Sequence, residues 1–232
     1  MSPAAKAPRR PAKSRAPATA GYRKGDETRE RVLGAALAAF GAAGFEAVTT
    51  RQIADAAGVS LPVLQYYFGG KEGLYRACAE TIVERFRGHT AGPAGSAAEA
   101  LESGCSAELA RSHLKEVIGA LARFLVETGP AEPWAQFAAR EQRDPGPAFD
   151  LLYERLWRPG IEITARLIAR IESQLDNDEA VRVRALLMIS SLMAFRSTRS
   201  VSLRTMGWPE IGAEQLGRIL EGLNLTIDAL GR

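Results

Sequence analysis

Residues 49–72, TTRQIADAAGVSLPVLQYYFGGKE, constrain the fold of this chain more than any other segment. Thr49 and Gln52 have the spacing of a capping box, which predicts a helix that begins directly after Thr49. Gly58 follows this helix, and a glycine can adopt the left-handed conformation that a sharp turn requires. Ser60 is a favourable N-cap for a second helix. We therefore expect two short helices joined by a tight glycine turn.

Two short helices joined in this way form a helix-turn-helix, which places its second helix in the major groove of DNA. Val59, Leu64 and Phe68 have the spacing of an inward face. The outward side chains suit DNA, because Gln65 can pair with an adenine edge through two hydrogen bonds. Lys71 is placed to reach a phosphate, a contact that sets the register without reading a base.

Residues 28–82 resemble the N-terminal domain of the TetR family of bacterial transcriptional regulators. The matching elements, in order, are RERVLGAALAAFGAAGFEAVTT, RQIADAAGVS, LPVLQYYF and GKEGLY. The resemblance implies that the DNA contacts are made by Thr50, Arg51, Leu61, Pro62, Val63, Gln65, Tyr66, Tyr67 and Lys71. Gln65 stands where tyrosine is common in the family, and Gly70 where serine or asparagine is usual. Because Gln65 can read a base edge, the operator sequence of a relative does not transfer to this chain.

The charge is unevenly distributed along the chain. Residues 1–25 contain seven basic residues and no acidic one, and the remainder contains 23 basic and 27 acidic residues. We expect residues 1–25 to form a disordered basic tail, which either follows DNA phosphates or is a solvated leader without a role. No apolar stretch typical of a secretory signal follows its basic residues.

The apolar content also bears on location. The longest apolar run, residues 185–195, is too short to cross a membrane, so we expect no membrane association. The two cysteines, Cys78 and Cys105, fit a reduced compartment. These features favour the bacterial cytoplasm, with the protein on the nucleoid when it is bound to DNA.

Helical periodicity continues to the end of the chain without an alternating strand pattern, so we predict an all-α protein. We expect a three-helix helix-turn-helix domain at residues 26–87, which ends in a connecting helix from 71 to 87. A larger helical bundle for ligand binding and dimerisation would follow at 88–232. Its first part, the Gly-rich segment 88–107, reads as a loop with room for a short helix. Helices are expected near 26–43, 108–128, 132–142, 146–158, 159–175, 177–198 and 208–230.

The expected helices near 177–198 and 208–230 are apolar on more than one side. A helix of this kind needs more than one neighbour, either within the chain or in a second copy. We favour a homodimer, because a single helix-turn-helix reads few bases and a two-fold dimer matches a palindromic operator.

A second resemblance concerns residues 140–159, REQRDPGPAFDLLYERLWRP, which are similar to the C-terminal domain of a TetR subgroup, the CerR type. It implies a sensor of an unknown small-molecule effector. A pocket needs apolar walls and a few polar groups. The candidate walls are Trp134, Phe137, Phe149, Tyr153 and Trp157, and the candidate polar contacts are His113, Gln136, Arg140 and Glu141. Aromatic residues at helical spacing equally fit an ordinary core.

Motifs of catalysis are missing from the sequence, which has no GxSxG elbow, P-loop or dinucleotide fingerprint. His89 and His113 lack metal-ligand spacing, so we expect no enzyme, cofactor or metal site. The predicted function is a homodimeric, ligand-responsive transcription factor that acts as a repressor on double-stranded DNA. The alternatives are a DNA-binding factor without a ligand and a helical enzyme with a vestigial DNA-binding domain.

Overall fold

The computed structural model describes residues 18–127, 132–175 and 178–231, and every regular element in these ranges is helical. The all-α prediction is therefore confirmed. The α-helices are α1 (Ala18–Ala47), α2 (Thr50–Ala57), α3 (Leu61–Phe68), α4 (Lys71–Glu102), α5 (Ala107–Ala122), α6 (Pro133–Arg143), α7 (Phe149–Leu152), α8 (Arg158–Glu172), α9 (Glu179–Met193), α10 (Arg199–Met206) and α11 (Ala213–Asp228). Two π-helical turns, η1 (Arg123–Glu127) and η2 (Tyr153–Trp157), continue α5 and α7.

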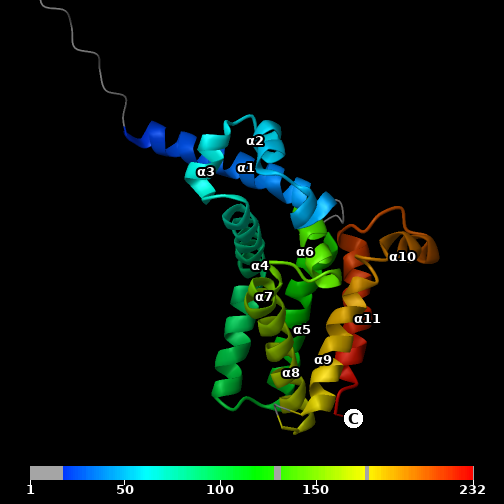
Figure 1. Ribbon diagram of the computed structural model, residues 1–232. Helices are drawn as coiled ribbons and strands as arrows, with labels where there is room; N and C mark the ends of the chain where they lie inside the picture. Colours follow the sequence, from blue (N-terminus) through cyan, green and yellow to red (C-terminus); the bar gives the residue numbers. More distant parts are fainter. Residues whose placement is uncertain (1–17, 128–131, 176–177, 232) are drawn as a thin grey trace, which may run out of the picture.

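Helices α1, α2 and α3 gather at one end of the molecule, and we call them the head (Figure 1). The long helix α4 leaves the head and runs beside α5 and α8, which with α9 and α11 form the helical body (Figure 1). Helix α6 lies between the two parts and packs against α1. The head is therefore joined to the body by two elements, α4 and α6.

Helix α1 begins at Ala18, eight residues earlier than the predicted start at Asp26. Residues 18–25, which were assigned to a disordered tail, are thus part of this helix, whereas residues 1–17 lie outside the described part. Gly44, the predicted stop, has a φ of 85° and interrupts the helical backbone, and a short helical segment then continues to Ala47. The buried stripe of α1 contains Val32, Ala36 and Phe40, as its periodicity indicates.

The local signals of the helix-turn-helix are confirmed. The hydroxyl of Thr49 accepts a hydrogen bond from the Gln52 backbone N–H at 3.3 Å, and the Gln52 side chain accepts one from the Thr49 backbone N–H at 2.8 Å. Gly58 ends α2 in the left-handed conformation, with φ 64° and ψ 39°. Ser60 holds the extended N-cap position of α3, although its side chain makes no capping hydrogen bond there.

The prediction of a loop at residues 88–107 is wrong for most of its length, because α4 continues to Glu102 with Pro93 inside it, and only residues 103–106 connect α4 to α5. Proline lacks the N–H that would bond to the carbonyl four residues earlier, which normally disfavours a helix interior. The segment is held by other contacts: the buried Thr90 hydroxyl donates to the Phe86 carbonyl at 2.9 Å, and Ala97 is fully buried in α4, which packs against α5. Tertiary burial therefore overrides the weak helix propensity of this segment.

The body is built around α5 and α8, which pack against each other and bury Leu114, Ile118, Leu167 and Ile168. Helix α10 was not predicted, and it protrudes beside the upper ends of α9 and α11 (Figure 1). In the ranges that the structure covers, no helix is long and apolar enough to cross a membrane.

Candidate nucleic-acid interface and ligand cavity

Helix α3 buries one face and displays the other. Leu64 is fully buried and Phe68 is 9% exposed, whereas the Tyr66 side chain is 84% exposed. Among the predicted DNA contacts, the exposed ones are Arg51, Leu61, Pro62, Gln65 and Tyr66, and the half-buried ones are Thr50, Val63, Tyr67 and Lys71. All nine predicted residues thus lie on α2, α3 or the first residue of α4, and none is buried.

Two of the predicted DNA contacts, Gln65 and Tyr66, are held by contacts in α3 and at its C-terminal end. The amide of Gln65 donates a hydrogen bond to the Gly69 carbonyl at 3.0 Å. The ring of Tyr66 lies edge-on to that of Tyr67, with 5.3 Å between the centroids. These local contacts orient polar groups on the exposed face without burying them.

Lys71 joins the first turn of α4 to the end of α1. Its Nζ donates to the Glu46 carbonyl at 3.3 Å and lies 4.4 Å from the centroid of the Phe45 ring. The ammonium group is therefore fixed at the edge of the head, near the N-terminus of α4, where the helix dipole also favours an anion such as a phosphate.

Arg140 of α6 caps the end of α1. Its Nε donates to the Gly41 carbonyl at 3.3 Å, and a terminal nitrogen donates to the Ala42 carbonyl at 2.7 Å. These carbonyls belong to the last turn of α1 before Gly44, where a cation satisfies carbonyls that lack helical partners. Arg140 was predicted to contact a ligand, but the structure places it between the head and the body.

Glu141 was also predicted to contact a ligand, and it too lies away from the cavity described below. Its carboxylate is 1% exposed and accepts hydrogen bonds from the Tyr75 hydroxyl at 2.5 Å and the Gly146 N–H at 3.1 Å. Burial, assisted by the hydrogen bond to Glu141, raises the pKa of Tyr75 far above its usual value. The Tyr75 ring meets Phe40 and Phe45 edge-on, so α4, α6 and the head share one small core.

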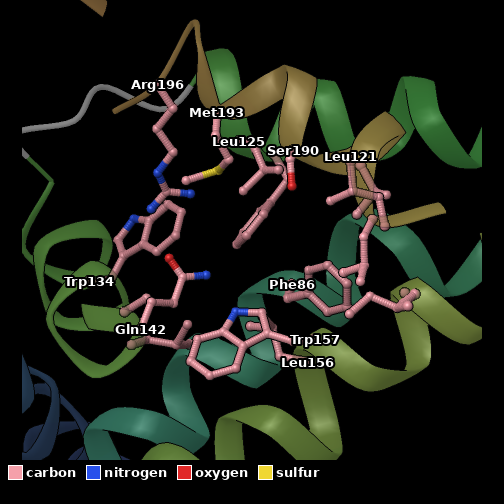
Figure 2. Close-up of a pocket in the computed structure, with 17 residues that line it drawn as sticks. Phe86, Leu121, Leu125, Trp134, Gln142, Leu156, Trp157, Ser190, Met193 and Arg196 are labelled. Carbon is pink, nitrogen blue, oxygen red and sulfur yellow. The ribbon is translucent and has the colours of Figure 1, made fainter. Parts of the chain in front are cut away.

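The body contains an apolar cavity of about 200 Å³, walled by α4, α5, η1, α6, η2, α8 and α9 (Figure 2). This volume exceeds by far the roughly 10–15 Å³ that one water needs by the same measure. Trp134 and Trp157 line it, as predicted for the pocket walls, together with Phe86, Phe124 and Met193. Gln142, Ser190 and Arg196 are the polar residues of the wall.

The other predicted pocket residues lie elsewhere. Phe137 is fully buried and packs on Tyr75, with 4.6 Å between the ring centroids. Phe149 stacks on Tyr153, which is 42% exposed on the outside of the body. His113 lies on α5 with its Nδ1 3.3 Å from a Glu116 carboxylate oxygen. Gln136 of α6 is not among the residues that line the cavity. These positions follow from the helical phase of each residue, which sequence alone could not relate to a cavity formed by seven elements.

Most residues that line the cavity were not predicted from the sequence, and Arg196 is the charged one among them. It is 9% exposed, its guanidinium lies 5.2 Å from the centroid of the Trp134 ring, and burial lowers its pKa. One signal could have found it: Arg196 directly follows the apolar run 185–195, where a charged residue is unexpected.

A helix-turn-helix head joined to a larger helical body is the architecture of a class of DNA-binding transcriptional regulators. Residues 32–78 match the family described as "Bacterial regulatory proteins, tetR family". Residues 110–229 match "HTH-type transcriptional dual regulator CecR, C-terminal domain", which spans about half of the chain. The chain belongs to the TetR family of transcriptional regulators and carries a C-terminal domain of the CecR type. The subgroup resemblance is confirmed, and its label is corrected from CerR to CecR.

Individual relatives agree with this assignment. The chain is 31% identical over 214 residues to the HTH-type transcriptional dual regulator CecR of Shigella flexneri, over 89% of this chain and 92% of the relative. The regulatory protein RaaS of Mycobacterium tuberculosis is 46% identical over 57 residues, 25% of this chain and 26% of the relative. Both relatives are named as transcriptional regulators.

Solved structures show the same fold. A TetR-like regulator from Rhodococcus sp. RHA1 aligns with a TM-score of 0.56 and 24% identity, over 85% of this chain and 93% of that one. The TetR family regulator PfmR from Thermus thermophilus aligns with a TM-score of 0.56 and 18% identity, over 88% of this chain and 95% of that one.

Proposed function

We propose that the protein is a ligand-responsive repressor that binds a palindromic operator as a homodimer. In this proposal, residues 26–87 form the DNA-binding domain and residues 88–232 the ligand-binding and dimerisation domain. The exposed face of α3 carries the proposal, because the 84% exposed Tyr66 and the exposed Gln65 stand opposite the buried Leu64 and Phe68. Short helices with this division dock in a major groove and offer their outward side chains to base edges.

The homodimer is supported by apolar side chains on the outside of α9 and α11. Leu187 is 66% exposed and Leu225 is 73% exposed. A groove lined by Phe195, Trp208 and Leu223, among others, runs between these helices and the end of α10. Exposed apolar patches of this kind mark protein–protein interfaces. Pairing through this surface would give the two heads the two-fold relation that a palindrome needs.

The switch is proposed to act through α4. Ile82 and Phe86 of this helix line the cavity, whereas Tyr75 of the same helix packs on Phe40 and Phe45 of the head. A ligand that displaces the cavity wall therefore moves the helix that carries the head. Two heads fit one duplex only when their α3 helices lie one DNA turn or a multiple apart. A ligand that binds the other arrangement more tightly would release the operator.

Selection of genomic fragments by the purified protein tests this proposal. We expect enrichment of a palindromic fragment, bound by two protomers, from a protein that works in the bacterial cytoplasm and on the nucleoid. Failure to enrich any fragment at low salt would overturn the DNA-binding role. Enrichment of an asymmetric site bound by one protomer would overturn the homodimer. A compound screen read by thermal stabilisation then separates a ligand-responsive regulator, which loses operator affinity with a stabilising compound, from one that does not respond to ligands.

A further inference from the structure

Arg196 places a positive charge inside the body. The residue follows α9, and its side chain, 9% exposed, reaches the cavity beside Trp134 and Met193 (Figure 2). Its guanidinium lies 5.2 Å from the centroid of the Trp134 ring, and one terminal nitrogen donates a long hydrogen bond of 3.4 Å to the Ala135 carbonyl. Both partners are neutral, so neither balances the charge.

No carboxylate in the described part of the chain forms an ion pair with Arg196, whereas Arg158, Arg184 and Arg218 of the body each pair with a glutamate. An arginine in a protein remains protonated, so the charge cannot be relieved by loss of a proton. A buried charge without a counter-ion is costly, and buried charges are normally paired. The cavity therefore contains an uncompensated positive charge, which a bound anion would neutralise.

The rest of the wall determines what kind of anion fits. Phe86, Leu121, Phe124, Trp157 and Met193 present apolar and aromatic surface to the cavity. An inorganic anion would satisfy the charge and leave this surface unused. Apolar walls with a few convergent polar groups are typical of sites for organic ligands.

We propose that the cavity binds an apolar organic anion, whose acid group pairs with Arg196 and whose ring or chain packs among the aromatic and aliphatic side chains of the wall. Gln142 and Ser190 lie in the same wall and offer an amide and a hydroxyl to the polar end of the ligand. The inference rests on the proposed function in one respect, because it names the chemical class of the effector for that site. It also makes Arg196 the residue that distinguishes an acid from a neutral compound of the same skeleton.

Two fluorescent probes with the same skeleton test the charge preference directly. Anilinonaphthalene sulfonate carries an acid group, and phenylnaphthylamine lacks it. Each is titrated into the full-length wild-type protein, Arg196→Met, Arg196→Lys and the control Arg204→Met, which removes an exposed arginine of α10. Competition between the two probes establishes that they occupy one site.

The ratio of the two dissociation constants is the readout, because changes in cavity shape affect both probes. We expect Arg196→Met to weaken sulfonate binding about tenfold or more relative to phenylnaphthylamine, as loss of a charge-assisted hydrogen bond predicts. Arg196→Lys should retain part of the preference, and Arg204→Met should leave it unchanged. Arg196→Met should also melt at a higher temperature than the wild type without probe, since it removes an uncompensated buried charge.

If the ratio of the two dissociation constants is the same in Arg196→Met as in the wild type, the proposal is overturned. It is also overturned if Arg204→Met abolishes the preference for the sulfonate as fully as Arg196→Met does. If Arg196→Met does not fold, the wild type is compared with Arg196→Lys. If both proteins bind the neutral probe more tightly than the sulfonate, and to the same degree, the proposal is also overturned.

Titration of the selected operator in parallel separates the anion site from the proposed switch. An Arg196-dependent sulfonate site that leaves operator binding unaltered supports the anion site and contradicts its effector role. A neutral probe that releases the operator equally well in all variants supports the switch and contradicts the anion class.

Discussion

The hydroxyl of Tyr75 in α4 donates a 2.5 Å hydrogen bond to the buried carboxylate of Glu141 in α6. The same tyrosine ring lies 4.8 Å from the ring of Phe40 in α1, measured between centroids. One side chain thus joins the helix that lines the cavity, the helix that caps α1, and the core of the head. Through this hydrogen bond and this ring contact, Tyr75 connects the head to the body.

Tyr75→Phe should destabilise the protein, because it leaves the buried Glu141 carboxylate with one hydrogen-bond donor fewer. We expect the free energy of unfolding to fall by about 1–3 kcal/mol, measured by urea denaturation at neutral pH. The matched control is Tyr153→Phe, whose phenol is on the outside of the body and whose change should stay within about 0.5 kcal/mol. Equal losses in the two variants would contradict the role given to the Tyr75 hydrogen bond.

The stability should fall in alkaline solution through Cys78. Burial raises the pKa of the fully buried Cys78 thiol to about 12 from 9.0. Above the pKa of the unfolded chain, the unfolded state loses a proton that the folded state keeps. The stabilisation is therefore complete below about pH 9 and is lost as the pH rises towards 12, by up to about 1.4 kcal/mol per pH unit.

Urea denaturation under reducing conditions at pH 8 and pH 10 checks this dependence. Between these two values the wild type should lose about 1.4 kcal/mol more than Cys78→Ala does. The raised pKa of Tyr75 acts in the same direction, but its largest causes, burial and the hydrogen bond to Glu141, are common to both proteins. Parallel losses in the wild type and Cys78→Ala would show that the Cys78 thiol does not contribute.

Lys71→Ala should weaken binding to the operator and to unrelated duplexes about equally, because in the proposed complex Lys71, at the N-terminus of α4, contacts a phosphate. The plot of log affinity against log salt concentration should become flatter by about one unit. Lys115→Ala is the control, since Lys115 pairs with Asp228 in the body and should leave the slope unchanged. Thermal melts must accompany the titrations, because Lys71 also bonds to the Glu46 carbonyl. An unaltered salt slope in a folded Lys71→Ala protein would remove Lys71 from the interface.

Charge introduced on the apolar surface of α9 and α11 should dissociate the proposed homodimer. Leu187→Asp and Leu225→Asp each bury a carboxylate in the proposed interface, which is costly without a partner. Light scattering after size exclusion should therefore report monomers, together with a loss of operator affinity. Leu175→Asp is the control, because Leu175 is 76% exposed and lies in the segment after α8, outside the proposed interface. This variant should remain a dimer. Dimers in all three variants would place the interface elsewhere.

The head could be predicted from the sequence because its signals are local. The Thr49–Gln52 capping box and the left-handed Gly58 each depend on a few adjacent residues, and the structure contains both. The course of α4 beyond residue 87 could not be predicted in this way. Its helix passes through Pro93 because Thr90 and Ala97 are buried against the body, which is a tertiary effect.

The candidate ligand site was predicted only in part, for a similar reason. Trp134 and Trp157 were identified as large apolar residues, and they line the cavity. Arg140 and Glu141 were selected for their polarity, but helical phase directs them to the end of α1 and to Tyr75. Arg196 comes from a turn far along the chain from Trp157, and only the packing of α9 on α8 brings the two into one wall.

Base preference measured on a randomised operator library tests the central claim most directly, namely that α3 reads DNA twice in a two-fold dimer. The wild type should select two symmetric half-sites whose centres are about 10 base pairs or a multiple apart. Gln65→Ala should lose the preference at one base pair in each half-site and keep it elsewhere. Selection of a site without two-fold symmetry, or an unchanged preference in Gln65→Ala, would contradict the account.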